Sequence, residues 1–497
     1  MTTTRLSLNR NWQIDHVSPL LFGGFLEHMG RAVYEGVFDP TSAHADADGV
    51  RLDVLEALRG LEMTTMRYPG GNFASGYHWA DGVGPADNRP TVRELAWQSI
   101  ETNQFGTDEF ISLCRKADWQ PMLAANLGTG TPEEARNWVE YCNSPVGSRW
   151  SDQRAANGNS EPFDVLYWCL GNEMDGPWQL GHVPAEHYGI RAQQAAKMMK
   201  DCDRRVRTVA CGSSAPEMPT FLEWDRKVLE QLGGLADYIS LHRYVGNPED
   251  SAEDYLAIGN SIDAQITAVD SCARFVAARR RRTKRAYLCF DEWNVWYKAR
   301  TPEDMNGRGL QAPHLIEEIY NLEDALVVAA FLMSFIRHAD VVKIANIAQI
   351  VNIIAPLITR GDDLLVQSIY YAFQMISTRK TGISLQVAHD GPSYVSQVYG
   401  EASEIDHAAI LDESGGRLHV FAMNRNVHKP SELTVEFAGT DLSVESAELL
   451  HSTLKAVNTF EDKNQVASIA FDGWHTDGSA KTELPPHSFL ATTFRLG

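Results

Sequence analysis

Two glutamates follow apolar runs of the sequence, and carboxylates at such positions can do nucleophilic or acid–base chemistry. Glu173 follows the run 165–170, and Glu292 follows the run 286–291. An unpaired carboxylate is costly to bury, so we expect each side chain to emerge into a cleft. Paired carboxylates are the catalytic groups of glycoside hydrolysis. One protonates the departing oxygen, and the other attacks the sugar carbon or activates water. Either glutamate alone could equally be a surface or salt-bridged residue.

Nearly every other apolar run also ends in polar or ionisable residues, and one shared polar site explains this better than separate accidents. Side chains near these ends that can bond sugar hydroxyls are Glu27, Asn72, Asn172 and Gln349. Tryptophans that can supply flat surfaces for sugar rings are Trp178, Trp293 and Trp296. A desolvated hydroxyl needs a fixed partner, so the sequence predicts a carbohydrate site around the two glutamates.

Other catalytic chemistries find no matching motif. His28, His78 and His242 lack the H-E-x-x-H spacing of zinc sites, which favours hydrogen-bonding roles over metal coordination. The sequence has no G-x-S-x-G string, which disfavours a serine nucleophile. We therefore expect no metal ligands among these residues.

Eight strand-like runs, rich in β-branched and aromatic residues, must position these side chains. The runs are 21–27, 64–68, 121–126, 165–170, 207–212, 238–242, 286–291 and 341–347. Between and after them, apolar residues recur at three- and four-residue steps, which is typical of amphipathic helices. The helical stretches are 50–61, 108–117, 132–142, 185–201, 221–232, 254–278, 323–338 and 364–377.

This alternation predicts a parallel sheet closed into a (β/α)8 barrel, a TIM barrel, with its active site at the carboxyl ends of the strands. The alternative is an open doubly wound sheet, for which we would expect a G-x-G-x-x-G turn, and the sequence has none.

The sequence changes character after about residue 380, where short apolar or alternating runs are separated by turn residues. The runs are 384–388, 418–424, 432–437, 446–451 and 488–495. They predict an antiparallel, jelly-roll-like β-sandwich. We expect a catalytic barrel over residues 16–380 and a sandwich over 381–497, joined by a strand-like stretch within residues 1–15.

The composition limits the classes of binding partner and the cell compartment that we expect for this protein. The 497 residues include 44 Lys and Arg against 65 Asp and Glu, a formal charge of −21, which argues against nucleic acid and anionic membranes as partners. A basic run at 279–285 fits a solvated helix end. The seven cysteines are scattered without a C-x-x-C pair, and the longest apolar stretch, 325–336, is too short to span a bilayer. We expect a cytoplasmic protein.

Five longer strings at the strand ends are similar to those of the α-L-arabinofuranosidases of glycoside hydrolase family 51, in clan A. They are FGGFLEH at 22–28, RYPGGNF at 67–73, GNEMDGPW at 171–178, DEWNVWY at 291–297 and AQIVN at 348–352. Each string is specific, whereas the bare Asn-Glu pair is not. The resemblance covers the whole chain, including the terminal sandwich.

The resemblance implies a retaining, exo-acting enzyme that removes terminal α-L-arabinofuranosyl groups from arabinan, arabinoxylan or their oligosaccharides. Glu173 would be the general acid/base, mostly protonated, and Glu292 the nucleophile, ionised beside Arg67. The residues expected to line the sugar subsite are Glu27, Arg67, Asn72, Asn172, Trp178, His242, Tyr244, Trp296 and Gln349. Arg67 and Tyr244 would also hold the nucleophile. The family needs no metal or organic cofactor, and its members are often homo-oligomers, frequently hexamers.

Two alternatives stay open at this point. Another clan A activity, such as an endo-glucanase or a xylosidase, would use the same barrel, and an endo-acting enzyme would have an open groove in place of a pocket for one ring. A non-catalytic sugar-binding protein gains no support, because both glutamates are present.

Overall fold

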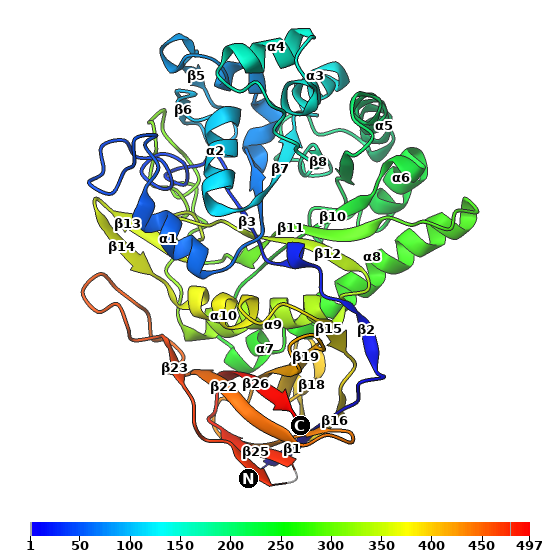
Figure 1. Ribbon diagram of the computed structural model, residues 1–497, viewed down its shortest axis with the longest axis vertical. Helices are drawn as coiled ribbons and strands as arrows, with labels where there is room; N and C mark the ends of the chain where they lie inside the picture. Colours follow the sequence, from blue (N-terminus) through cyan, green and yellow to red (C-terminus); the bar gives the residue numbers. More distant parts are fainter. Residues whose placement is uncertain (1, 478) are drawn as a thin grey trace.

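The larger part of the molecule is a closed barrel of eight parallel strands (Figure 1). The structure is a computed structural model, and it describes residues 2–477 and 479–497. In order around the barrel, the strands are β3 (Gly23–Phe25), β4 (Thr65–Tyr68), β7 (Gln120–Ala125), β8 (Tyr167–Leu170), β9 (Arg207–Ala210), β10 (Tyr238–Val245), β11 (Tyr287–Val295) and β12 (Val342–Ala348). β12 pairs in parallel with β3 and closes the barrel. Each of the eight predicted runs overlaps one of these strands, and the (β/α)8 barrel is confirmed.

Helices surround the barrel, and most follow the apolar periodicity of the sequence. They are α1 (Leu52–Gly60), α2 (Thr107–Ala117), α3 (Pro132–Asn143), α4 (Arg149–Ala156), α5 (Ala185–Cys202), α6 (Glu223–Leu232), α7 (Ala252–Leu256), α8 (Gly259–Arg279), α9 (Leu322–Arg337) and α10 (Ser368–Ser377). The stretch 254–278, predicted as one helix, is divided between α7 and α8, and the break falls just before Gly259, a poor helix former. α10 begins later than predicted because Leu364 belongs to a hairpin of β13 (Leu357–Arg360) and β14 (Asp363–Val366). α4 is too polar to show an apolar period.

Helix α9 accounts for the most apolar stretch of the sequence. It lies between the barrel and the sandwich (Figure 1), where Phe331 packs on the barrel residue Trp293 with ring centroids 5.0 Å apart. On its other side it contacts β19 (Ile405–Asp412) and β20 (Arg417–Asn424). Burial on all sides explains why its sequence is apolar all round. Among the residues described, no helix is long and apolar enough to cross a membrane.

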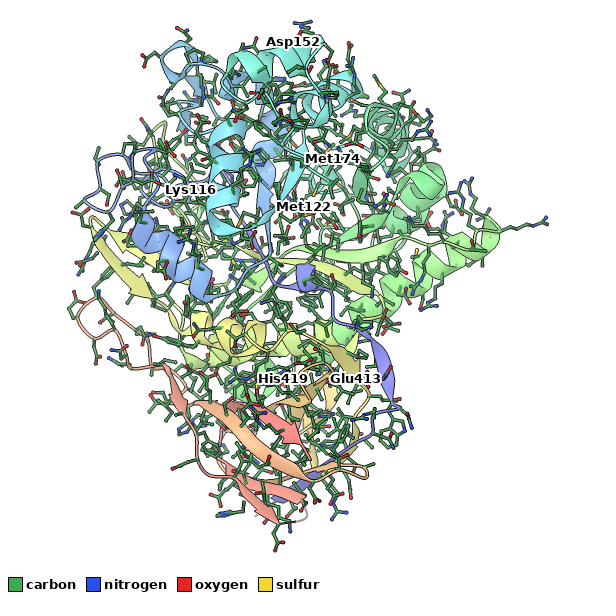
Figure 2. All side chains as sticks on the ribbon, in the orientation of Figure 1. Lys116, Met122, Asp152, Met174, Glu413 and His419 are labelled. Atoms are coloured by element: carbon green, nitrogen blue, oxygen red, sulfur yellow. The ribbon has the colours of Figure 1, made fainter. Side chains whose placement is uncertain are left out.

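The remaining long strands form two sheets that face each other across a second apolar core, which includes Leu418, Leu433 and Phe494. The seven-stranded sheet contains, in order, β2 (Gln13–His16), β15 (Ile383–Leu385), β19, β20, β26 (Ser488–Leu496), β22 (Leu442–Leu450) and β23 (Ser468–Ala470). The five-stranded sheet contains β16 (Ala388–Asp390), β1 (Thr2–Leu8), β21 (Ser431–Phe437), β25 (Ser479–Leu484) and β24 (His475–Asp477). Figure 2 labels Glu413 and His419 in this part of the molecule and Met122 in the barrel. The predicted sandwich is confirmed.

The N-terminal stretch contributes one strand to each sheet of the sandwich. β1 pairs in parallel with β21, and β2 pairs antiparallel with β15. The strand-like stretch within residues 1–15 thus forms two strands, and the chain turns between them, where the Trp12 amide donates to the Asn9 carbonyl at 3.0 Å.

Candidate active site

Glu173 lies in a sharp turn that follows β8 at the carboxyl end of the barrel. Gly171 has φ +86° and Glu173 has φ +44°, so the backbone is left-handed at both residues. A non-glycine residue adopts this conformation only where the surroundings hold it. Here the amide of Gly176 donates to the Glu173 carbonyl at 2.8 Å. The turn directs the Glu173 carboxylate across the barrel mouth toward His242 of β10.

Strand β11 has a β-bulge where it supplies the second carboxylate. Against β10, Ser240 pairs with Cys289 and His242 pairs with Glu292. Over this interval β11 therefore contains one residue more than β10. The same shift occurs against β12. A regular strand alternates its side chains between two faces, and an extra residue breaks the alternation. Asp291 and Glu292 therefore both contact groups in the barrel mouth.

The two glutamates predicted to be catalytic lie close together. One oxygen of each carboxylate and one ring nitrogen of His242 all lie within 4.8 Å of one another. Retaining glycosidases hold their two carboxyl groups about 5–5.5 Å apart, and inverting enzymes hold them about 6.5–9.5 Å apart. Oxygen atoms this close fit the retaining arrangement, in which one carboxylate attacks the sugar directly.

Glu292 is buried and is held from two sides. Arg67 Nη1 donates to its Oε1 at 2.7 Å, and the Tyr244 hydroxyl donates to its Oε2 at 2.9 Å. Burial raises the pKa of Glu292, and the neighbouring Glu173 adds to this effect, while His242 and Arg67 oppose it. The pKa of Glu292 therefore lies above its ordinary value, whereas the pairing with Arg67 alone had led us to expect a readily ionised group.

Glu173 receives hydrogen bonds from two neighbours. Its Oε1 lies 2.9 Å from His242 Nδ1, and its Oε2 accepts from Trp178 Nε1 at 2.5 Å. Burial lowers the pKa of His242, but the adjacent Glu292 and Asp291 outweigh burial and hold that pKa well above its ordinary value. His242 is therefore a cation that can donate from both ring nitrogens.

Glu27 and Gln349 lie beside the catalytic pair at the ends of β3 and β12. The Glu27 amide donates to Gln349 Oε1 at 2.9 Å. The Glu27 carboxylate accepts at Oε1 from the Phe73 amide and from Trp97 Nε1, both at 3.0 Å. Burial and the negative charge of Glu292 raise the pKa of Glu27 to about 8. Glu27 is thus largely neutral at pH 7 and can donate a hydrogen bond to a ligand.

Asn172 is tied into the same group. Its Oδ1 accepts from Arg67 Nη2 at 2.7 Å, which orients its amide nitrogen toward Gln179 Oε1 at 3.5 Å. Asn72 is half-buried at the start of a short 3-10 helix after β4, and its carbonyl accepts from Gln179 Nε2 at 3.5 Å. A single arginine therefore fixes both Asn172 and Glu292.

The three tryptophans proposed as sugar platforms have different surroundings. Trp178 is 52% exposed and reaches Glu173. Trp296 is half-buried, with its ring 5.4 Å from that of Tyr244 and with the Arg300 guanidinium 4.1 Å from its centroid. Trp293 is fully buried among phenylalanines of α9 and α10, so its assignment as a platform was wrong. After the bulge, the alternation of β11 directs this side chain outward from the barrel.

Of the three histidines considered, only His242 contacts Glu173 and Glu292. His28 is buried between Glu101 and the Tyr68 hydroxyl, at 2.8 and 2.7 Å. His78 is exposed and lies 2.9 Å from Glu134. Both have the hydrogen-bonding surroundings that the sequence predicted.

Two residues of the site were overlooked in the sequence. Asp291 was counted as the last residue of a strand, yet it contacts Arg67 and His242. Trp97 comes from a loop hairpin, β5 (Val92–Arg93) and β6 (Ile100–Glu101), that has no apolar period or motif. A charged residue next to a predicted nucleophile was the one available signal for Asp291; Trp97 had none.

Glu173, His242 and Glu292 also form the one group of potential metal ligands found among the described residues. Metal coordination needs a neutral imidazole nitrogen. The raised pKa of His242 favours its protonated form, and a proton competes with a metal ion for this position.

Family models match most of the chain. One described as Alpha-L-arabinofuranosidase 1 domain matches residues 57–260, and one described as Alpha-L-arabinofuranosidase C-terminal domain matches residues 291–488. Among curated relatives, the Intracellular exo-alpha-(1->5)-L-arabinofuranosidase 1 of Bacillus subtilis (strain 168) is 42% identical, over 97% of this chain and 95% of the relative. The Exo-alpha-(1->6)-L-arabinofuranosidase of Bifidobacterium longum is 39% identical, over 98% and 96%.

Solved structures give the same result. A family 51 alpha-L-arabinofuranosidase from Bifidobacterium longum has a TM-score of 0.95 and 35% identity, with both chains covered completely. An arabinose complex of the alpha-L-arabinofuranosidase from Thermotoga maritima has a TM-score of 0.89 and 30% identity, with 99% of both chains covered.

Proposed function

The chain belongs to the α-L-arabinofuranosidases of glycoside hydrolase family 51, and on that premise we propose that Glu292 and Glu173 carry out its reaction by double displacement. The activity is that of an exo-acting α-L-arabinofuranosidase, which releases terminal non-reducing α-L-arabinofuranosyl groups. The observation that carries the proposal is the placement of one oxygen from each carboxylate within 4.8 Å, together with the two donors that hold Glu292.

In the first half-reaction, a Glu292 oxygen forms a bond to the anomeric carbon while the bond from that carbon to the leaving oxygen breaks. Glu173 gives its proton to the departing oxygen. In the second, Glu173 takes a proton from water, the water oxygen bonds to the anomeric carbon, and Glu292 leaves as a carboxylate. Arabinose is released with its anomeric configuration retained.

The surrounding residues have separate roles in this proposal. Arg67 and the Tyr244 hydroxyl orient Glu292 and stabilise its charge. His242 and Trp178 orient Glu173. Asn172 is placed to bond the sugar 2-hydroxyl, an interaction that strengthens as oxocarbenium character develops.

The remaining subsite residues bind the other parts of the furanose ring and the leaving group. Glu27 and Gln349 lie together at one side of the pair, with Asn72 in the neighbouring turn. Trp296, beside Tyr244, is assigned to the wall of the pocket.

For the substrate, we propose short α-(1→5)-linked arabino-oligosaccharides inside the cell. Four of the curated bacterial relatives at 41–42% identity are named intracellular exo-alpha-(1->5)-L-arabinofuranosidases. The Bifidobacterium relative named for (1->6) cleavage makes linkage the property to test first. Hydrolysis rates of α-(1→2)-, (1→3)-, (1→5)- and (1→6)-linked arabinobioses measure it directly.

We also propose that the barrel, residues 16–380, carries catalysis, and that the sandwich, residues 381–497 with the N-terminal strands, serves stability and assembly. The family resemblance favours a homo-oligomer, with a hexamer as the expected form. Size-exclusion chromatography with light scattering determines the mass; a monomeric mass at working concentration would contradict the assembly proposal.

The catalytic roles are tested with Glu292→Ala and Glu173→Ala on aryl α-L-arabinofuranosides. We expect Glu292→Ala to be inactive. Glu173→Ala should slow substrates with poor leaving groups far more than activated ones, and azide should partly restore turnover by replacing the water that needs a base. Unchanged activity in either variant would refute the corresponding role. Aryl β-D-xyloside and β-D-glucoside in the same assay test the alternative clan A activities.

A further inference from the structure

Asp291 lies fully buried next to the nucleophile in the chain, and it contacts the two cations that touch the catalytic carboxylates. Its Oδ2 lies 3.3 Å from Arg67 Nε, and its Oδ1 lies 3.3 Å from His242 Nε2. The Ser240 hydroxyl also donates to Oδ1, and the Cys169 thiol lies 3.6 Å from Oδ2. The pKa of Asp291 is raised by burial, but Arg67 and His242 outweigh that effect and lower it to about 2. It is therefore a permanent anion.

Each of the two cations continues to a different catalytic group. Arg67 Nη1 reaches Glu292 at 2.7 Å, and His242 Nδ1 reaches Glu173 at 2.9 Å. One buried carboxylate thus connects to both glutamates through two bridging cations. The bulge of β11 makes this possible, because it lets Asp291 and Glu292 face the barrel mouth side by side.

The charge of Asp291 matters most at one stage of the cycle. When Glu292 forms its bond to the sugar, it becomes an ester and loses its negative charge. Arg67 and His242 then retain only Asp291 and Glu173 as neighbouring anions among the residues described. Buried cations without a partner are costly: an arginine side chain then moves, and a histidine moves or loses its proton. Asp291 supplies the charge that persists through this stage.

We propose that Asp291 is a positioning residue that holds Arg67 and His242 in place while Glu292 is esterified, so that Glu173 remains oriented as the base for deglycosylation. This inference rests on the proposed roles of Glu173 and Glu292. It assigns the larger effect of Asp291 to the second half-reaction.

The test is Asp291→Asn, which keeps the shape and removes the charge, assayed with an aryl α-L-arabinofuranoside that has a good leaving group. For such a substrate kcat/KM reports the first half-reaction, and kcat reports the second when that step is slow. We expect kcat to fall roughly 100-fold, the lower end of a general acid–base contribution. KM should fall roughly tenfold with it, and a burst of the aryl alcohol should precede the steady state.

The matched control is Asp237→Asn. Asp237 is also buried, directly before β10 at the opposite end of the barrel, where it pairs with Lys200 and Lys284. A loss of folded protein lowers kcat alone and leaves KM unchanged, and this is the most that we expect of the control. Ser240→Ala, which removes one hydrogen bond to Asp291, is a milder second variant; its kcat and KM should fall together by roughly threefold.

Asp291→Asn with unchanged KM and no burst, or with kcat within about threefold of the parent, would overturn the proposal. If Asp291→Asn does not fold, Ser240→Ala decides it: a joint fall of kcat and KM supports the proposal, and an unchanged KM without a burst overturns it. Failure of the proposed function looks different: the parent enzyme releases no arabinose, or Glu292→Ala stays active.

Discussion

Glu27→Gln provides a direct test of the electrostatics of the pocket, because the structure gives Glu27 a pKa of about 8 against an ordinary value of 4.5. The side chain is 3% exposed at the end of β3. Its Oε1 accepts two hydrogen bonds, from the Phe73 amide and from Trp97 Nε1. Its Oε2 accepts one longer hydrogen bond, from Gln349 Nε2 at 3.4 Å. A glutamine with its oxygen at the first position keeps the two hydrogen bonds from Phe73 and Trp97 and, like the neutral acid, carries no charge; its nitrogen cannot accept from Gln349 Nε2, so only this long contact is lost.

The expected size follows from the pKa shift of Glu27. A difference of 3.5 between 8 and 4.5 corresponds to about 5 kcal/mol, as an upper bound for a buried group. Because the pKa of Glu27 is higher in the folded chain than in the unfolded chain, its contribution to the stability of the folded protein is fully present below about pH 4.5. That contribution is lost as the pH rises to about 8. Glutamine does not titrate. The unfolding free energy of Glu27→Gln, relative to the parent, should therefore rise between about pH 5 and pH 9.

Urea unfolding at about pH 5, 7 and 9 measures this difference. Asp53→Asn is the control, because burial raises the pKa of Asp53 but its pairing with Arg51 outweighs burial and lowers that pKa below 3.8. Asp53 is therefore ionised in both folded and unfolded chains over this range, and its variant should show a constant difference. A constant difference for Glu27→Gln as well would mean that Glu27 is ionised in the folded protein, and the inferred neutral donor would be wrong.

Three further substitutions test contacts of the site and of the barrel. Tyr244→Phe removes the donor to Glu292, and we expect kcat/KM to fall roughly 10- to 100-fold, the effect of one hydrogen bond to a charged group. Trp178→Phe removes the Nε1 donor to Glu173; a plot of rate against leaving-group pKa should become steeper, and an unchanged slope would exclude a role in acid catalysis. Gly23→Ala places a Cβ 2.4 Å from Asn346 Nδ2 and 2.5 Å from Thr65 Cγ2. Calorimetry should therefore show a free energy of unfolding lower by about 1–3 kcal/mol, with an unchanged KM.

The barrel could be predicted from the sequence because strands of a parallel barrel are buried on both faces and appear as continuous apolar runs. The predicted ends of the last strands were too early. β10 continues to Val245 and β11 to Val295, past polar residues such as His242 and Glu292. These polar residues lie within strands because the barrel mouth provides partners for them, and a sequence does not display those partners.

The errors at the site have one physical origin. Trp293 was assigned to the sugar pocket, and Asp291 was left out of it, because a β-bulge shifts which residues of β11 face inward. A bulge depends on the hydrogen-bond register of two neighbouring strands and leaves no local mark in composition. Trp97 illustrates the same limit, since its contact with Glu27 joins residues far apart in the chain.

The pairing of β1 with β21 also affects the order in which the molecule can form during translation. Leu8 and Ser431 are 423 positions apart. At about 5–20 residues per second, the N-terminal strand waits roughly 20 to 85 s for its partner to be synthesised. β1 also pairs with β16, and the barrel strands all precede both partners in the chain, so the barrel can assemble while β1 is still unpaired. A chaperone or a neighbouring chain has this interval in which to bind the strand. Slow translation therefore increases the exposure of this strand, and deletion of β1 removes it.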